Sequence, residues 1–370
     1  MFRQYKLRNY NFRLVIFVIA LGLIGYLAVG SAQESLKQRQ MFGILLGILL
    51  MLFLSLIDYT IYQYLYWIFY VVNIILLALV LSPLGVEVNG SKRWINIGFQ
   101  FQPSELAKIL LILFFAQFIM KHKDKINSIR ILLTSVILLA APLYLVYEEP
   151  DLSTSIMIVV TFCVMIFVGG LSYKIVFCLL AILIPVVIAF FAIIMQPDAE
   201  ETFLHGYQLT RILAWLEPEK YADSAAYQQL NSITAIGSGQ LLGKGLDNNV
   251  IASVKNGNFI SEPQTDFIFA IVGEELGFIG SAAVVVLIFL IVSECLLIAR
   301  NARNMAGSLI ASGVAGLIGL QAFLNIAVAT GLAPNTGIPL PFVSYGLTSL
   351  VSLFGAIGIV INIGLQTKKH

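Results

Sequence analysis

The stretch FISEPQTDFIFAIVGEELGFIG, residues 259–280, passes from a polar, acidic segment into strongly apolar sequence without a break. It places Glu262 and Asp266 at the mouth of an expected membrane helix, and Glu274 and Glu275 about two turns further in. An ionised carboxylate in hydrocarbon costs at least about 3 kcal/mol. Four acids on one entering helix therefore indicate a water-filled cavity, a partner or a functional site. The alternative is that they only cap the helix, as a Thr-Asp pair commonly does, or pair with lysines elsewhere.

The composition indicates a polytopic membrane protein. Of the 370 residues, 59% are hydrophobic and only 11% are charged, which is far too apolar for a soluble globule. The net charge of +2 and the absence of aromatic residues interleaved with basic ones argue against nucleic-acid binding. Cys163, Cys178 and Cys295 show no CxxC spacing and the three histidines are scattered, so the sequence predicts neither a disulfide framework nor a metal site.

Apolar runs of about 17 to 25 residues, the length that crosses a bilayer, predict ten transmembrane helices. Their approximate spans are 14–32, 40–57, 61–83, 103–120, 130–147, 152–170, 172–195, 266–298, 305–331 and 343–365. We therefore expect an all-α membrane protein in which residues 1–370 form a single domain. Its one large polar loop, 196–265, leads into the acidic stretch.

The basic residues predict the orientation of this bundle. With a cytoplasmic N-terminus, most of the 22 Lys and Arg residues fall in inside segments, whereas the short outside loops carry only Lys37, Arg39, Lys92 and Arg93. The positive-inside rule then places both termini in the cytoplasm and the loop 196–265 outside. Lys123 and Lys369 are expected inside, and Lys220 and Lys255 outside.

A glycine-rich segment of the large loop, 237–245, superficially matches a phosphate-binding loop. Ser238 stands where the first Walker glycine belongs, and no Ser or Thr follows Lys244, so we reject a nucleotide site. Two alternatives stay open: the backbone N–H groups and Lys244 cradle a phosphate, or the segment is a flexible loop with a solvated lysine.

Three more polar segments are expected on the same outer side. Residues 89–98 precede a helix start that carries Glu105 and, on the same face one turn later, Lys108. These two charges either neutralise each other or leave Lys108 to bind an anion in a cavity. A second segment contains Glu148, Glu149 and Asp151. The third, 334–346, is dense in Pro and Gly, which indicates irregular backbone around protein or water, or simply a stiff turn.

Several of these segments together resemble one known family. The blocks KRW (92–94), QPSELAK (102–108), EPDLSTS (149–155), YQLTRILAWLEPE (207–219), AIGSGQLLGKG (235–245), TDFIFAIVGEELG (265–277) and GIPLPFVSYG (337–346) occur in order. They are similar to the signature blocks of the SEDS family of cell-wall polymerases, which includes RodA, FtsW and SpoVE. The block around Arg211, with its Leu-Glu-Pro run, is closer to RodA than to FtsW.

The resemblance implies a peptidoglycan glycosyltransferase that polymerises lipid II at the outer face of the bacterial cytoplasmic membrane, for cell elongation and shape. It would work among membrane lipids with a class B penicillin-binding protein as transpeptidase. Lipid II carries its own undecaprenyl pyrophosphate leaving group, so no ATP is needed. Because the donor is α-linked and the product β-linked, one inverting displacement suffices. No cofactor is certain, and a divalent cation is left open.

The resemblance also assigns roles to residues. Asp266 matches the proposed catalytic aspartate and would act as general base on the acceptor hydroxyl. Arg93, Lys108, Arg211 and Lys244 are the candidate cations for the developing pyrophosphate charge. The full set of expected substrate-binding residues is Lys108, Glu105, Arg93, Trp94, Asp151, Arg211, Lys244, Glu262 and Ser344. Expected structural support comes from Glu274, Glu275, Pro339, Pro341 and Gly346.

Two other functions would suit ten helices with intramembrane acids. One is a lipid II flippase, and the other is a scaffold that only recruits the transpeptidase. A transporter should open to both faces in turn, whereas the polar clusters here gather on one expected side, so polymerisation is favoured.

Overall fold

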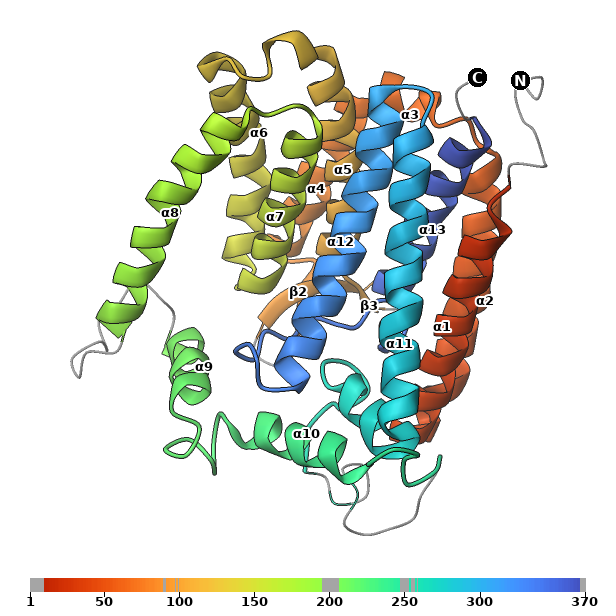
Figure 1. Cartoon of the computed structure of the whole chain (residues 1–370), viewed down its shortest axis with the longest axis vertical. Helices are drawn as coiled ribbons and strands as arrows, with labels where there is room; N and C mark the ends of the chain where they lie inside the picture. The colour runs from red at the N-terminus through yellow and green to blue at the C-terminus, as the bar shows by residue number, and fades with distance from the viewer. Residues whose placement is uncertain are drawn as a thin grey trace.

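The computed structural model describes residues 10–88, 91–96, 98, 100–194, 206–246, 253, 257 and 259–366. Among these residues, eight helices are long and apolar enough to cross a membrane, and two shorter apolar helices, Tyr66–Leu81 and Leu152–Val168, correspond to the remaining expected spans. The helices form one bundle (Figure 1). Their bounds are α1 Phe12–Ala32, α2 Glu34–Leu56, α4 Tyr66–Leu81, α5 Pro103–Lys121, α6 Ile129–Glu148, α7 Leu152–Val168, α8 Tyr173–Ile194, α11 Ile268–Asn301, α12 Met305–Ala329 and α13 Leu347–Leu365.

Helix α5 lies at the centre of the bundle and α8 at its edge. In α5, 89% of the membrane-spanning window is buried, and the helix packs against α4, α7, α12 and α13. This fits a helix whose apolar residues lie on every face after its first two turns. In α8, by contrast, none of the window is buried, and the helix leans away from the bundle in Figure 1. Such an apolar surface requires lipid around it.

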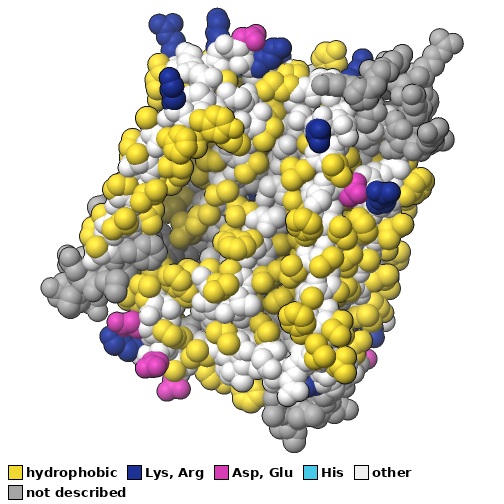
Figure 2. Space-filling view, in the orientation of Figure 1, with side chains coloured by type: hydrophobic (Ala, Val, Ile, Leu, Met, Phe, Trp, Pro, Cys, Tyr) yellow, Lys and Arg dark blue, Asp and Glu magenta, His cyan; other side chains and the backbone are white. Residues whose placement is uncertain are grey.

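Charged side chains separate to the two ends of the bundle, with an apolar belt between them (Figure 2). The first described residues of α1 and the last of α13 lie at the same end as the C-terminal ends of α5 and α11. Lys121, Lys123, Arg130, Lys174 and Arg300 all lie at this end. The opposite end carries α9, Gly206–Leu216, and α10, Tyr227–Ser238, both in the large loop.

Three expected spans need correction. The third is not one helix, because a five-residue helix α3, Thr60–Tyr64, precedes α4 and the chain turns at Leu65 between them. The tenth begins at Leu347 instead of 343, after an irregular segment. The eighth begins only at Ile268 and is interrupted at Gly277, whose φ of 64° and ψ of −160° are not helical. Asp266 and Glu262 therefore precede the helix, and the four acids do not share one continuous helix.

The structure also contains a small sheet that the sequence interpretation missed. Strands β1, Gly85–Val88, β2, Ser91–Asn96, and β3, Gln100–Phe101, pair antiparallel in the order β1-β2-β3. The register pairs Val86 with Trp94 and Ile95 with Phe101. A three-residue 3-10 helix, η3, Lys123–Lys125, follows α5 at the other end. The sheet places Arg93 and Trp94 just before α5, at the end of the bundle where Asp266 lies.

Candidate functional site

Asp266 lies immediately before α11, and neighbouring segments fix its backbone. Asn325 of α12 donates from Nδ2 to the carbonyl oxygens of Asp266, at 2.8 Å, and Ile338, at 2.7 Å. Ser344 donates from Oγ to the carbonyl of Thr265 at 2.6 Å and accepts from the amide of Leu340 at 2.7 Å. The segments before α11 and α13 are therefore tied together, with α12 behind them.

The carboxylate of Asp266 is half-buried against the backbone of Gly337. A methyl group built on Gly337 would lie 3.3 Å from Asp266 Oδ2, and Gly337 has a φ of +70°. A side chain at this position would be strained and would press on the carboxylate. Gly337 thus permits the close approach of the acid to the 337–345 segment.

Charged groups from three elements act on Asp266. The pKa of Asp266 is raised to about 6, chiefly by burial and further by the negative charge of Glu262. The positive charges of Arg211 and Arg93 and a hydrogen bond from Thr265 act in the opposite direction and lower the pKa. Two guanidinium groups and one carboxylate are therefore within electrostatic reach of this acid. A carboxyl with a pKa near neutral pH is suited to proton transfer.

Arg211 is placed by contacts between α9 and the segment after α12. Its Nη1 donates to the carbonyl of Asn335 at 3.4 Å. On the same helix, Trp215 donates from Nε1 to the carbonyl of Gly331 at 3.0 Å. The expected cation from the large loop is thus brought to the end of α12 that also holds Asp266. Glu262 is exposed and accepts a hydrogen bond from Gln264.

Arg93 joins the small sheet to the α6–α7 turn. Its Nε donates to the carbonyl of Glu149 at 3.1 Å, its Nη2 donates to the carbonyl of Pro150, and its Nη1 lies 3.9 Å from Asp151 Oδ2. Asp151 caps α7, accepting from the amide of Thr154 at 3.0 Å and from its hydroxyl at 2.9 Å. The expected residues Arg93 and Asp151 are brought together here, whereas Trp94 is half-buried in the sheet, opposite Val86.

Glu149 is a member of this cluster whose environment the sequence interpretation missed. Its side chain is fully buried, and burial, reinforced by Asp151 and opposed by Arg93, raises its pKa to about 9. The acid is thus protonated at neutral pH. Only the clustering of Glu149 with Asp151 was visible in the sequence, because its burial depends on the packing of the α6–α7 turn.

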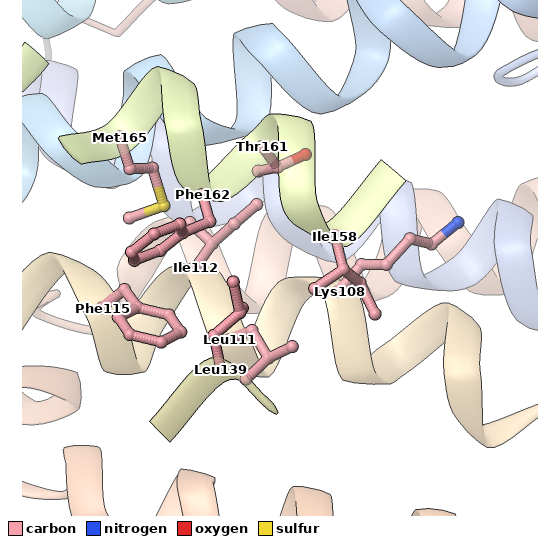
Figure 3. A pocket seen from close by; sticks show the side chains of 9 residues that line it. All are labelled: Lys108, Leu111, Ile112, Phe115, Leu139, Ile158, Thr161, Phe162 and Met165. Atoms are coloured by element: carbon pink, nitrogen blue, oxygen red, sulfur yellow. The ribbon is translucent and has the colours of Figure 1, made fainter. Parts of the chain in front are cut away.

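Glu105 and Lys108 form a buried ion pair on α5. Lys108 Nζ lies 2.8 Å from Glu105 Oε1, and the two side chains are 4% and 5% exposed. Figure 3 shows the lysine stem beside a narrow apolar cavity, with Nζ pointing away from Phe115 and Met165. In this pair each charge neutralises the other, which agrees with the first of the two alternatives that the sequence left open. The anion-binding alternative requires that Lys108 exchange this partner.

The glycine-rich loop packs against the interruption in α11. The amides of Lys244 and Gly245 donate to the carbonyls of Glu274, at 2.9 Å, and Glu275, at 3.0 Å. Lys244 Nζ also lies 2.7 Å from Glu274 Oε1, and Ser31 of α1 donates to Glu275. These two amides and the ammonium group are therefore engaged with α11, so binding of a phosphate by Lys244 requires that it exchange this partner.

The remaining expected residues lie in the irregular segment before α13. The carbonyl of Pro339 accepts from Gln321 Nε2 at 3.0 Å, Pro341 lies two residues later, and Gly346 immediately precedes α13. Ser344 is buried with its hydroxyl engaged in the contacts described above. Gln321 and Asn325, which organise this segment, were missed. Their signal was two amides four residues apart in an otherwise apolar helix.

The fold is therefore a polytopic helical bundle with carboxyl and guanidinium groups gathered at one end. Residues 7–369 match the FtsW/RodA/SpoVE family, described as cell cycle protein, and the chain belongs to this family. It is 34% identical to the probable peptidoglycan glycosyltransferase FtsW of Taylorella equigenitalis, over 92% of this chain and 90% of the relative. It is 32% identical to the peptidoglycan glycosyltransferase MrdB of Escherichia coli, over 96% and 93% of the two chains.

Solved structures have the same fold. One of them comes from a study of the structural coordination of polymerization and crosslinking by a peptidoglycan synthase complex. It matches with a TM-score of 0.79 and 28% identity, over 96% of this chain and 97% of that chain. The rod shape determining protein RodA of Thermus thermophilus matches with a TM-score of 0.69 and 26% identity, over 98% of both chains. The all-α fold expected from the sequence is confirmed.

Proposed function

We propose that the protein is a peptidoglycan glycosyltransferase that polymerises lipid II at the outer face of the cytoplasmic membrane. Family membership and the names of the relatives support this activity. The observation that carries the proposal is the environment of Asp266, a half-buried carboxyl whose pKa is raised to about 6 beside Arg211 and Arg93. Proton acceptance next to fixed positive charge is what this reaction requires.

In the proposed reaction, Asp266 removes the proton from the 4-hydroxyl of the acceptor GlcNAc. That oxygen attacks C1 of the donor sugar, and the C1–O bond to undecaprenyl pyrophosphate breaks in the same displacement, so the α-linked donor gives a β-linked product. Arg211 and Arg93 lie close enough to Asp266 to influence its pKa, and they stabilise the negative charge on the departing pyrophosphate.

The apolar edge of the bundle is a suitable surface for the lipid tail of the substrate. A polyprenyl chain must stay in hydrocarbon while its sugars reach Asp266, and α8 offers an apolar surface with none of its spanning window buried. Asp266 lies at the end of the bundle, outside the described spanning helices. A tail in the bilayer and a head group at the bundle end are therefore compatible.

The proposal includes a role in cell elongation and shape, with a class B penicillin-binding protein as partner and both termini in the cytoplasm. The similarity to a peptidoglycan synthase complex supports the partner, and the RodA-like Arg211 block supports elongation. A divalent cation is the cofactor left open by the sequence. Among the described residues, no group of three or more His, Cys, Asp or Glu gathers to hold one, so we derive no step through a metal.

The test is glycan synthesis from purified lipid II by the reconstituted protein, with and without its transpeptidase partner. Asp266→Asn keeps the shape of the side chain but cannot accept the proton, so chain growth should fall by about 10² to 10⁴-fold. Binding of lipid II and of the partner should persist. Near wild-type synthesis by Asp266→Asn would overturn the catalytic assignment. Loss of synthesis with binding retained would separate a polymerase from a flippase or a scaffold.

A further inference from the structure

A second polar site lies at the end of the bundle opposite Asp266. A cavity of about 590 Å³ opens where the end of α5 meets the turn between α11 and α12. Three exposed cationic side chains line it, Lys123, Arg300 and Arg303, and none of its lining residues is acidic. Binding sites for small ligands are typically of this size, about 300 to 1,000 Å³.

The start of α12 adds to the positive potential of this cavity. Asn304 and Met305 line it, and Asn304 caps α12 by accepting from the amide of Gly307 at 2.9 Å. The positive end of a 25-residue helix therefore faces the cavity. Arg303 also interacts electrostatically with Asp58, so its charge is partly balanced. Lys123 and Arg300 are the better positions for a test.

Four apolar residues, Met120, Ala299, Ala302 and Met305, form another part of the cavity wall, together with Ser308. The site lies at the ends of membrane-spanning helices, where hydrocarbon gives way to water. A ligand that fits both walls carries an anion next to an apolar chain. Basic pockets between helix ends bind phosphate-bearing lipid head groups in this way. Inorganic phosphate has no apolar part that could contact these residues.

We propose that this cavity binds the phosphate head group of an anionic phospholipid in the adjacent leaflet. Lys123 and Arg300 contact the phosphate oxygens, and the apolar residues contact the start of the acyl chains. The site is independent of the glycosyltransferase proposal, because it lies at the far end of α5 and α11 from Lys108 and Asp266. It stabilises the lipid-embedded bundle at that end.

The experiment counts lipids retained by the purified full chain in native mass spectrometry. Detergent micelles are supplemented with phosphatidylglycerol, phosphatidylcholine or inorganic phosphate. Wild-type protein should retain phosphatidylglycerol in preference to phosphatidylcholine. Lys123→Gln and Arg300→Gln should each weaken its apparent affinity by about fivefold, the effect of one cation near an anionic lipid. Arg300→Lys keeps the charge and should keep the lipid.

Matched controls are Arg130→Gln and Lys174→Gln, which remove cations from the same end of the bundle but outside the cavity. They should retain phosphatidylglycerol as the wild type does. An equal loss in these controls would overturn the proposal, as would equal retention of phosphatidylcholine. Displacement of the lipid by inorganic phosphate at equal concentration would overturn the lipid assignment. Unfolding midpoints without lipid check that each variant is folded.

Discussion

At the scale of single residues, the ionisation of Asp266 should control the pH dependence of glycan synthesis. A general base works only when deprotonated, and burial raises the pKa of this acid from 3.8 to about 6. The rate should therefore level off above pH 6 and fall about tenfold per pH unit below it. The measurement is kcat/KM for lipid II between about pH 4 and pH 8. Lipid II binding over the same range is the control, and a rate that falls only near pH 4 would contradict the assignment.

Gly337 should be required for the position of that carboxylate. In Gly337→Ala the new methyl group lies 3.3 Å from Asp266 Oδ2 at a φ of +70°, so either the acid or the loop must shift. Displacement of a catalytic group by about 1 Å can cost about 10²-fold in rate. We expect synthesis to fall while expression and lipid II binding are retained.

The matched control for Gly337 is Gly170→Ala, which also places a side chain at a positive φ, +97°, but has no atom within 4 Å of the new methyl group. It lies between α7 and α8, at the other end of the bundle. The control should lose stability without loss of synthesis per folded molecule. Equal activity losses in the two variants would indicate backbone strain instead of displacement of Asp266.

The buried Glu105–Lys108 pair calls for a double variant. Removal of one partner leaves an uncompensated buried charge, which typically costs about 3 to 5 kcal/mol. Lys108→Met alone should therefore unfold or insert poorly, whereas Lys108→Met with Glu105→Gln should recover the unfolding midpoint. If Lys108 also binds the pyrophosphate, the double variant stays inactive in glycan synthesis. Recovery of synthesis in the double variant would leave mutual neutralisation as the sole role of the pair.

At the scale of elements, the membrane-spanning helices could be predicted from the sequence, whereas the interruption within α11 could not. Length and apolarity are local properties, so ten spans could be placed from the sequence. The interruption of α11 at Gly277 depends on a loop more than 30 residues earlier, which no local pattern encodes. The small sheet did have a local signal, Asn89-Gly90 between residues of high strand propensity.

In the candidate site, likewise, the charged residues could be found from the sequence, whereas the contacts that position them could not. The polar blocks around Asp266, Arg211 and Arg93 could be brought together by family resemblance, since each carries a charge that stands out in apolar sequence. The hydrogen bond from Asn325 to Asp266 joins residues 59 positions apart and depends on how α12 is rotated. Such contacts follow from packing and could not be predicted from residue spacing.

The interruption in α11 at Gly277 should be sensitive to substitution. A methyl group on Gly277 would lie 2.3 Å from the amide nitrogen of Gly243, so Gly277→Ala must separate α11 from the glycine-rich loop. Its φ of +64° adds strain. We expect a loss of more than about 1 kcal/mol in the free energy of unfolding. The measurement is the unfolding midpoint in detergent.

Gly319→Ala, in regular helix on α12, is the control for Gly277. Its methyl group would make an ordinary contact, 3.5 Å from Val292. This variant should be neutral or slightly stabilised, because alanine favours the helix. If both variants unfold at the wild-type midpoint, the packing of residues 239–245 on α11 does not contribute to stability.

At the scale of the whole molecule, the separation of charge between the two ends predicts the orientation. Lys121, Lys123, Arg130, Lys174 and Arg300 lie at the end shared by the described ends of α1 and α13. The positive-inside rule places that end in the cytoplasm. Lys220, after α9, lies at the opposite end with Asp266. Lys255 and Lys369, for which the sequence makes matching predictions, lie outside the described residues.

Cysteine labelling in intact cells tests this orientation. Cys163, Cys178 and Cys295 are first replaced, and single cysteines are introduced as Lys123→Cys and Lys220→Cys. A membrane-impermeant maleimide should label position 220 from outside and position 123 only after the membrane is opened. The result bears directly on chemistry, because a lipid-linked sugar acceptor can be polymerised into the wall only on the outer side. Outside labelling at position 123 would place Asp266 in the cytoplasm and exclude wall synthesis at that site, whatever the activity of the purified protein.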